Sequence, residues 1–179
     1  MYEWLHYFNA YGWFSLIIFL EYLFPNRRYE LLNQGWLSDL FHTYEPMARA
    51  MLINACAVGI NGLLPMHGPL KDLLLEAPAW QVFLMALFVS ETSFYFVHRL
   101  LHWNPILWEF HRVHHSSTRY YSLMTSRFHL LDVVLFIAPY VVIMGWFGAG
   151  GIGLLWFGFF QGFVDRYGHS NINGPRFTG

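Results

Sequence analysis

Charged side chains are scarce in this chain. Asp, Glu, Lys and Arg make up 12% of its 179 residues, against about 25% in soluble domains. So few charges cannot cover a water-soluble globule, and the 56% hydrophobic content indicates surfaces that face lipid. The net charge of −1 offers no basic field to a polyanion, which excludes nucleic-acid binding. The same apolar content excludes a disordered chain.

Cysteine is also almost missing. Cys56 is the single cysteine, so neither an intramolecular disulfide nor a cysteine-ligated metal site can form within the chain. Any bound metal ion must therefore be held by nitrogen or oxygen. Histidine, in contrast, occurs ten times. This unusual count in so apolar a chain directs the search for function.

Long apolar stretches divide the chain. A bilayer core about 30 Å thick needs roughly 20 apolar residues of helix, and three stretches approach that length, each with a proline at one end. A fourth apolar block is too long for one crossing, and we predict that it folds back at its GAGG sequence. The sequence therefore predicts an all-α integral membrane helical bundle of four to five transmembrane or re-entrant helices, forming a single domain over 1–179. The stretches are 8–24, 47–64, 79–97 and 130–164, with the turn at 148–151.

Arginine would gather on one side of such a bundle. If five segments alternate, Arg27, Arg28, the loop 98–129 and the tail 165–179 share one side, and the other side has only Lys71. The positive-inside rule makes the arginine-rich side cytoplasmic. The histidines of the loop and of the tail then lie on the same cytoplasmic face, where they could form one site.

Five of the ten histidines follow the third apolar stretch. His98 and His102 are one helical turn apart in HRLLH, and HRVHH contains His111, His114 and His115. A single HxxxH pair is often only packing. Five imidazoles at the mouth of a membrane helix cost solvation energy unless they are liganded or hydrogen-bonded. Because neutral imidazole is a common ligand of iron, zinc, copper and nickel, we predict a metal site here.

The segments HRLLH, NPILWEFHRVHHSS and SRFHLLD resemble the fatty acid hydroxylase and sterol desaturase superfamily of integral membrane oxygenases. The resemblance covers 79–174 and implies a histidine-box di-iron centre on the cytoplasmic side, with zinc as a substitute in isolated protein. It implies hydroxylation or desaturation of a C–H bond of a lipid, such as a fatty acid or sterol, with dioxygen as co-substrate. Electrons would come from a separate donor such as a cytochrome b5 or ferredoxin system. The implied metal ligands are His98, His102, His111, His114, His115 and His169, the last in the sequence HSNI.

The family's final histidine box is missing. The resemblance places it shortly after the HSNI segment, but the sequence ends at Gly179. We therefore expect a C-terminally truncated fragment that is inactive alone. The compact chain, without targeting extensions, favours a bacterial inner membrane over the endoplasmic reticulum.

Two other functions compete with the oxygenase. A haem-binding membrane electron-transfer protein would pair single histidines on facing spans. A metal transporter would place ionisable ligands at mid-membrane depth, where only Glu21 and Glu91 are expected. His129 is predicted to support a ligand from behind or to fix a loop rather than to bind metal. Trp108 and Tyr120 are assigned to an interfacial aromatic belt.

Overall fold

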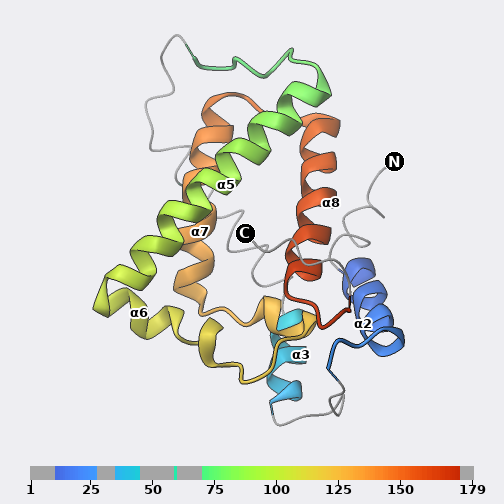
Figure 1. Ribbon diagram of the computed structural model, residues 1–179. Coiled ribbons are helices and arrows are strands. Elements are labelled where there is room, and N and C mark those ends of the chain that lie inside the picture. The colour runs from blue at the N-terminus through green and yellow to red at the C-terminus, as the bar shows by residue number, and fades with distance from the viewer. Residues whose placement is uncertain (1–10, 28–34, 45–58, 60–69, 174–179) are drawn as a thin grey trace.

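Helices make up the regular structure of the described residues, which are 11–27, 35–44, 59 and 70–173 of the computed structural model (Figure 1). The predicted all-α class is confirmed. The α-helices are α2 (Trp13–Leu23), α3 (Trp36–Tyr44), α5 (Ala79–Trp103), α6 (Pro105–His111), α7 (Leu130–Trp146) and α8 (Gly151–Gly168), and two short 3-10 helices are η2 (His114–Ser116) and η3 (Ser122–Ser126).

The longest helix, α5, carries the first two histidines of the predicted site. It begins directly after Pro78, as predicted, because proline fixes an extended residue before the first turn. It continues past the end of the apolar stretch at residue 97 and stops at Trp103, so His98 and His102 lie on its last two turns. Its 25 residues span roughly 37 Å.

The helices α7 and α8 form the predicted hairpin. Their connection includes Gly148 and Gly151, which have φ values of +66° and +68°, a region that glycine enters without steric cost. The prediction that this apolar block folds back at 148–151 is therefore confirmed. The two helices run antiparallel, with the turn at the end opposite to α6 (Figure 1).

The predicted number of membrane spans is not confirmed. Among the described residues, α5 is the one helix long and apolar enough to cross a membrane, while α2 and α7 are shorter apolar helices. The predicted span 47–64 lies, apart from Gly59, outside the described residues. A helix of 11 residues such as α2 covers only about half of a bilayer core.

The core lies where α5 crosses the hairpin. Gly153 of α8 packs against the start of α5 so closely that an added Cβ would lie 2.5 Å from the carbonyl oxygen of Ala79. The segment before α5 closes this end, because the backbone amide of Leu74 donates to the carbonyl of Phe147 at 2.7 Å. The buried core residues are Leu74, Val82, Ala86, Val89, Met144 and Phe157.

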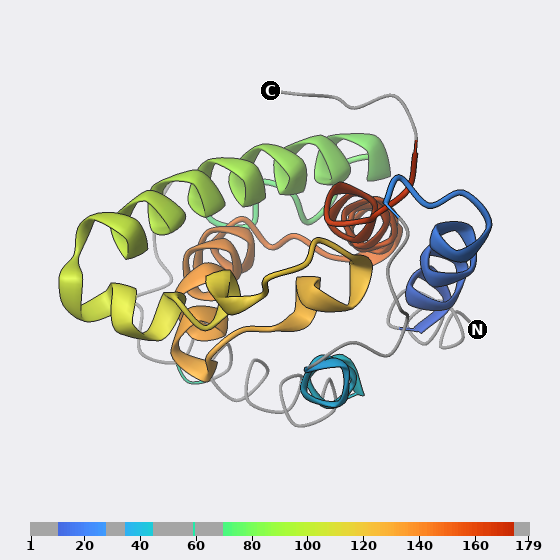
Figure 2. The same cartoon turned by 60° about the horizontal axis from the view of Figure 1, so that its bottom comes forward.

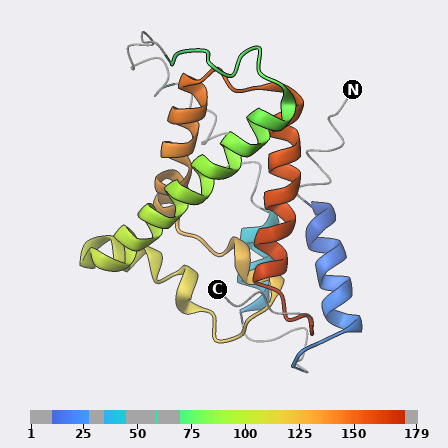
Figure 3. The ribbon, with the colours of Figure 1, turned by 45° about the horizontal axis from the view of Figure 1, so that its top comes forward.

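The other end of the molecule gathers the remaining elements. There α7 begins, α8 ends, and the chain from α6 through η2 and η3 runs between them (Figure 2). Helix α2 lies beside α8, and its Trp13 packs against Phe159 and Phe163 (Figure 3). Helix α3 contacts η3. The histidine-rich segments therefore lie next to elements that are distant in sequence.

Candidate metal centre

A sharp corner between α5 and α6 brings the two predicted histidine boxes together. Asn104 leaves helical geometry with φ −91° and ψ 119°, and its side chain accepts hydrogen bonds from the backbone amides of Ile106 and Leu107. Pro105 then occupies the first turn of α6, where a missing N–H costs nothing. The short α6 returns toward α5, so that His111 at its end faces the last two turns of α5.

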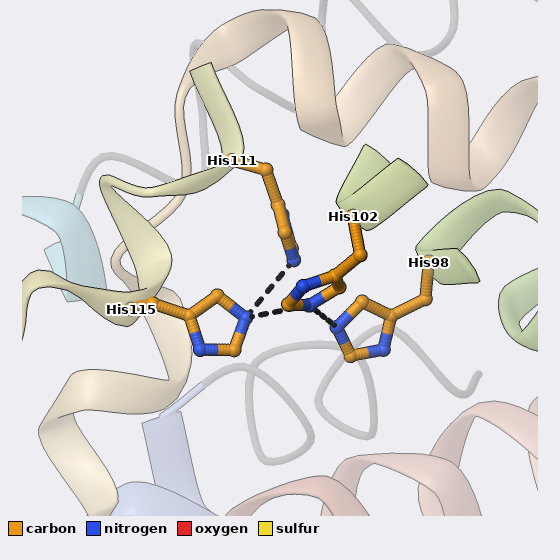
Figure 4. A group of neighbouring side chains, drawn as sticks. All are labelled: His98, His102, His111 and His115. Carbon is orange, nitrogen blue, oxygen red and sulfur yellow. Dashed lines mark hydrogen bonds between the residues drawn. The ribbon is translucent and has the colours of Figure 1, made fainter. Parts of the chain in front are cut away.

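Four imidazoles converge in the space enclosed by this corner (Figure 4). The Nε2 atom of His102 lies 3.0 Å from that of His98 and 3.1 Å from that of His115. The Nε2 atoms of His115 and His111 are also 3.1 Å apart. We call His98, His102, His111 and His115 the four-histidine cluster; each offers one nitrogen, and all four nitrogens lie within 4.8 Å of one another.

Protons alone do not explain this convergence. An imidazole nitrogen carries either one proton or one lone pair, yet Nε2 of His102 and Nε2 of His115 each contact two other ring nitrogens. One proton or one lone pair makes only one well-aligned hydrogen bond. A metal ion accepts the lone pairs of all four rings at once, and ligands at right angles with metal–nitrogen bonds of about 2.1 Å lie about 3.0 Å apart. The four-histidine cluster therefore fits a metal ion.

His111 has a buried carboxylate behind its ring. Its Nδ1 lies 3.5 Å from Oδ2 of Asp132, and both side chains are almost completely buried. Asp132 lies in the first turn of α7, so the hairpin brings it to the cluster. A carboxylate facing Nδ1 favours a proton there and leaves the Nε2 lone pair free for a metal ion.

Three aromatic rings form a second group beside the cluster. His114 is buried, stacks on Phe128 with ring centroids 4.3 Å apart, and lies 5.7 Å from the ring of His169. The ring of Tyr120 covers His169 at 5.7 Å. The Nδ1 atom of His169 donates to the carbonyl of Asp165 at 2.8 Å, which leaves its Nε2 with the lone pair. We call His114, His169 and Tyr120 the His169 group.

The three histidines of the second box, His111, His114 and His115, have lowered pKa values. Burial, followed by the neighbouring imidazoles, lowers the pKa of His111 to about 3 and that of His114 to about 4. Burial, followed by repulsion from neighbouring imidazoles, lowers the pKa of His115. Packing imidazoles this closely penalises every added proton. The lowered pKa values of these three histidines favour the deprotonated form that binds metal ions.

All six predicted site histidines lie at this end of the molecule. His98, His102, His111 and His115 form the four-histidine cluster, and His114 lies between the cluster and His169, with its ring 5.7 Å from that of His111. His129 has a different place: its Nδ1 accepts from the backbone amide of Leu131 and caps α7, which is the loop-fixing role expected for it. His42 donates to the carbonyl of Ser38 within α3.

Sequence reasoning missed three residues that contact or approach these histidines. Asp132 had a detectable signal, since it is a carboxylate in the first turn of a very apolar helix. Trp108 and Tyr120 were assigned to an interfacial belt. Trp108 packs on the cluster, with its ring 5.0 Å from that of His102 and 5.6 Å from that of His115. Its position between the two boxes was the only signal for this contact.

One comparison with known proteins covers this region of the chain. The family model described as fatty acid hydroxylase matches residues 83–178, which include all six site histidines. The ornithine lipid hydroxylase OlsE of Rhizobium tropici is 36% identical over 95 residues, a match that covers 53% of this chain and 28% of OlsE. No solved structure matches the chain significantly. Because the family model covers more than half of the chain and the resemblance noted from its histidine boxes is confirmed, the chain belongs to the fatty acid hydroxylase family.

Proposed function

We propose that this protein is a membrane-bound lipid hydroxylase that uses two iron ions, dioxygen and electrons from a separate protein. The observation that carries the proposal is the convergence of four Nε2 atoms at the end of α5, the helix that is long and apolar enough to cross a membrane. Family membership supports lipid hydroxylation in general. The iron pair, the use of dioxygen and the electron donor are parts of the proposal.

The six histidines would divide between the two ions. The four-histidine cluster would hold one ion, and His114 and His169, which face each other beside it, would contribute to the second. When bound, the iron pair supplies the oxygen activation needed to functionalise an aliphatic C–H bond, which amino-acid side chains cannot perform. Zinc would occupy the same nitrogen ligands in isolated protein without supplying this chemistry.

The chain's own residues orient the ligands. Asp132 faces Nδ1 of His111, and the carbonyl of Asp165 accepts the Nδ1 proton of His169. Each interaction fixes a ring so that its Nε2 lone pair faces the interior of the site. These residues therefore prepare the ligand nitrogens before any metal ion binds.

Aromatic side chains make one wall of the site apolar. Phe136 of α7 lies with its ring 6.0 Å from the rings of both His98 and His111. Phe94 stacks on Phe136 at 4.6 Å, and Phe128 lies against its edge at 5.9 Å. This wall would exclude water and receive the hydrocarbon part of a lipid next to the histidines.

The substrate class follows from this wall and from the relative. OlsE is named as a hydroxylase of ornithine lipid, and we propose a bacterial membrane lipid as the substrate here. The location would be the bacterial inner membrane, with the site at the cytoplasmic interface, as the distribution of arginines predicts. A cytochrome b5 or ferredoxin system would deliver the electrons.

The arrangement of the histidines disfavours the two alternatives. A haem would be held by histidines on facing spans, whereas the four ligand nitrogens come from consecutive elements at one end of α5. A transport path would place ligands along the middle of the membrane. The cluster instead lies where α5 ends.

A labelling experiment tests the proposal. Because the 179-residue chain is expected to be inactive alone, the test uses the protein together with the final histidine box that the resemblance implies. This protein, loaded with iron in detergent, is supplied with bacterial lipids, an electron-transfer partner and isotopically labelled dioxygen. We expect one labelled oxygen atom in the lipid, and no product from the double variant His111→Ala, His115→Ala. His42→Ala, which changes a histidine outside the cluster, serves as the matched control. A Soret band in the optical spectrum, or unlabelled lipid in every sample, would overturn the proposal.

A further inference from the structure

Glu21 of α2 joins two segments that lie far away in the sequence. Its Oε1 accepts from the backbone amides of Ser122 at 2.9 Å and Asn171 at 2.6 Å. Its Oε2 accepts from the hydroxyl of Ser122 at 2.8 Å. Ser122 is fully buried, so the carboxylate provides acceptors where water is excluded. Glu21 lies outside the region 83–178 that the family model matches.

Both partners of Glu21 lie close in sequence to the His169 group. Ser122 comes two residues after Tyr120, and Asn171 comes two residues after His169. The rings of Tyr120 and His169 are stacked, and the Tyr120 hydroxyl donates to the carbonyl of Gly168 at 2.9 Å. One carboxylate therefore holds the two backbone segments from which these facing rings project.

Backbone pairing strengthens the same connection. The segment after α2 runs antiparallel to the segment after His169, with an isolated bridge between Pro25 and Ile172. The amide of Asn26 donates to the carbonyl of Asn171 at 2.7 Å, and the amide of Asn173 donates to the carbonyl of Phe24 at 2.8 Å. The exit of the chain from α8 is thus fixed by α2 and by the residues that follow it.

The four-histidine cluster is supported by other elements. Its members come from α5, α6 and η2, while α2 contacts chiefly α8 and η3. Loss of Glu21 is therefore expected to disturb the His169 group and to leave the four-histidine cluster unchanged.

We propose that Glu21 is a positioning residue that holds His169 and Tyr120 in place beside His114. The inference deepens the proposed function and rests on it for the metal-binding role of His169. The positioning role itself does not depend on metal binding, because Glu21 accepts hydrogen bonds from Ser122 and Asn171 whether or not a metal ion is bound.

Two substitutions of Glu21 separate hydrogen bonding from charge. Glu21→Gln keeps an oxygen that accepts from both backbone amides, and its NH2 group can donate to the Ser122 hydroxyl. Glu21→Leu has similar bulk and removes all three acceptors, leaving buried donors without partners. Glu76→Leu is the matched control, because Glu76 is exposed and lies in the segment before α5, which bonds to the end of α7 rather than to α2. Ser122→Ala removes one of the three bonds and serves as a milder variant should Glu21→Leu fail to fold.

Hydrogen exchange of the metal-free protein in detergent is the first measurement. In Glu21→Leu we expect exchange to rise roughly tenfold in segments 120–122 and 169–173 and to stay unchanged in 98–115. Ser122→Ala should give a smaller rise in the same two segments, and Glu21→Gln and Glu76→Leu should match the unaltered protein. Equal exchange in Glu21→Leu and the unaltered protein, or an equal rise in 98–115, would overturn the proposal.

Iron content is the second measurement. Measured in protein that includes the final histidine box implied by the resemblance, Glu21→Leu should keep the ion of the four-histidine cluster and lose the other, whereas Glu21→Gln should keep both. Unchanged iron content in Glu21→Leu would overturn the role of Glu21 in metal binding. If the unaltered protein itself binds no iron, the proposed function fails, while the exchange experiment still decides whether Glu21 holds the two segments.

Discussion

The four-histidine cluster and the His169 group are built in different ways. The cluster draws its ligands from residues 98–115, and its geometry follows from a helical repeat, an Asn104 cap and a short returning helix. The His169 group brings together η2, the segment before η3 and the end of α8, and Glu21 bonds to a residue 150 positions away. One part of the centre is local in sequence, and the other depends on the whole fold.

This difference predicts how the two parts respond to damage. A local arrangement needs only α5, α6 and the start of the next loop to be formed. A long-range arrangement needs several elements to be docked at once, and its loop-closure entropy must be offset by hydrogen bonds and packing. Substitutions in distant helices should therefore disturb the His169 group before they disturb the cluster.

Removal of cluster ligands should have the largest effect. In the double variant His111→Ala, His115→Ala only two of the four converging nitrogens remain, and we expect loss of the ion held there. His169→Ala should leave that ion bound and reduce only the amount of the second ion. Metal analysis after dialysis measures both variants, with His42→Ala as the control. Full metal content in the double variant would show that these imidazoles are not ligands.

The next largest effect is a loss of stability when the contact between α3 and the loop that follows the second histidine box (111–115) is broken. The Arg127 guanidinium binds Asp39, which is 1% exposed and also accepts from Tyr121, and it donates to the Ser116 hydroxyl at 3.0 Å. Arg127→Met leaves a buried carboxylate without this cation, so we expect a loss of about 3 kcal/mol in the free energy of unfolding.

A matched arginine at the end of α6 provides the control. Arg112 pairs with Glu109 at 3.1 Å, but both side chains are about 60% exposed, so Arg112→Met should cost less than about 1 kcal/mol. Denaturant unfolding in detergent compares the two variants. Equal stability losses would mean that burial of Asp39 does not determine the strength of the Arg127 contact.

Much of the local structure was predictable from the sequence. Pro78 marked the start of α5, the glycines at 148–151 marked the α7–α8 turn, and the spacing of His98 and His102 placed both on one helical face. In each case the signal and the structure lie within a few residues, because helix breakers and the helical repeat act locally.

The long-range contacts were not predictable in the same way. Glu21 was noticed only as an ionisable residue expected at mid-membrane depth, and neither Asn171 nor Ser122 carries a pattern that identifies it as the partner. The partners of Asp39 were equally hidden, although a buried carboxylate must find donors somewhere. The ring contact between Tyr120 and His169 was also hidden, because it depends on how α8 docks.

Asp132→Asn tests the support of a single cluster ligand. Asp132 is fully buried and faces Nδ1 of His111 at 3.5 Å. Removing its charge weakens the preference for a proton on Nδ1, so metal affinity of the cluster should fall by about 10- to 100-fold. Asp72→Asn is the control, because Asp72 has φ +59° and asparagine tolerates this conformation. Competition with a chelator measures the affinities, and equal values for both variants would contradict the role of Asp132.

Tyr120→Phe should have the smallest effect and gives the finest comparison of the two parts. It removes the hydroxyl that donates to the carbonyl of Gly168 at 2.9 Å but keeps the ring that stacks on His169. A hydrogen bond from a half-exposed side chain contributes about 1 kcal/mol or less, so hydrogen exchange should rise a few-fold, at most, at the end of α8.

Tyr95→Phe is its counterpart on α5, where the Tyr95 hydroxyl accepts from Arg99 at 2.8 Å. That variant should leave exchange at 167–171 unchanged, because Tyr95 belongs to the helix that carries the cluster. If both substitutions loosen the end of α8 equally, the two parts of the centre are coupled through the bundle. If only Tyr120→Phe does so, contacts at the His169 group hold that part separately, as the dependence of this group on α2 and α8 requires.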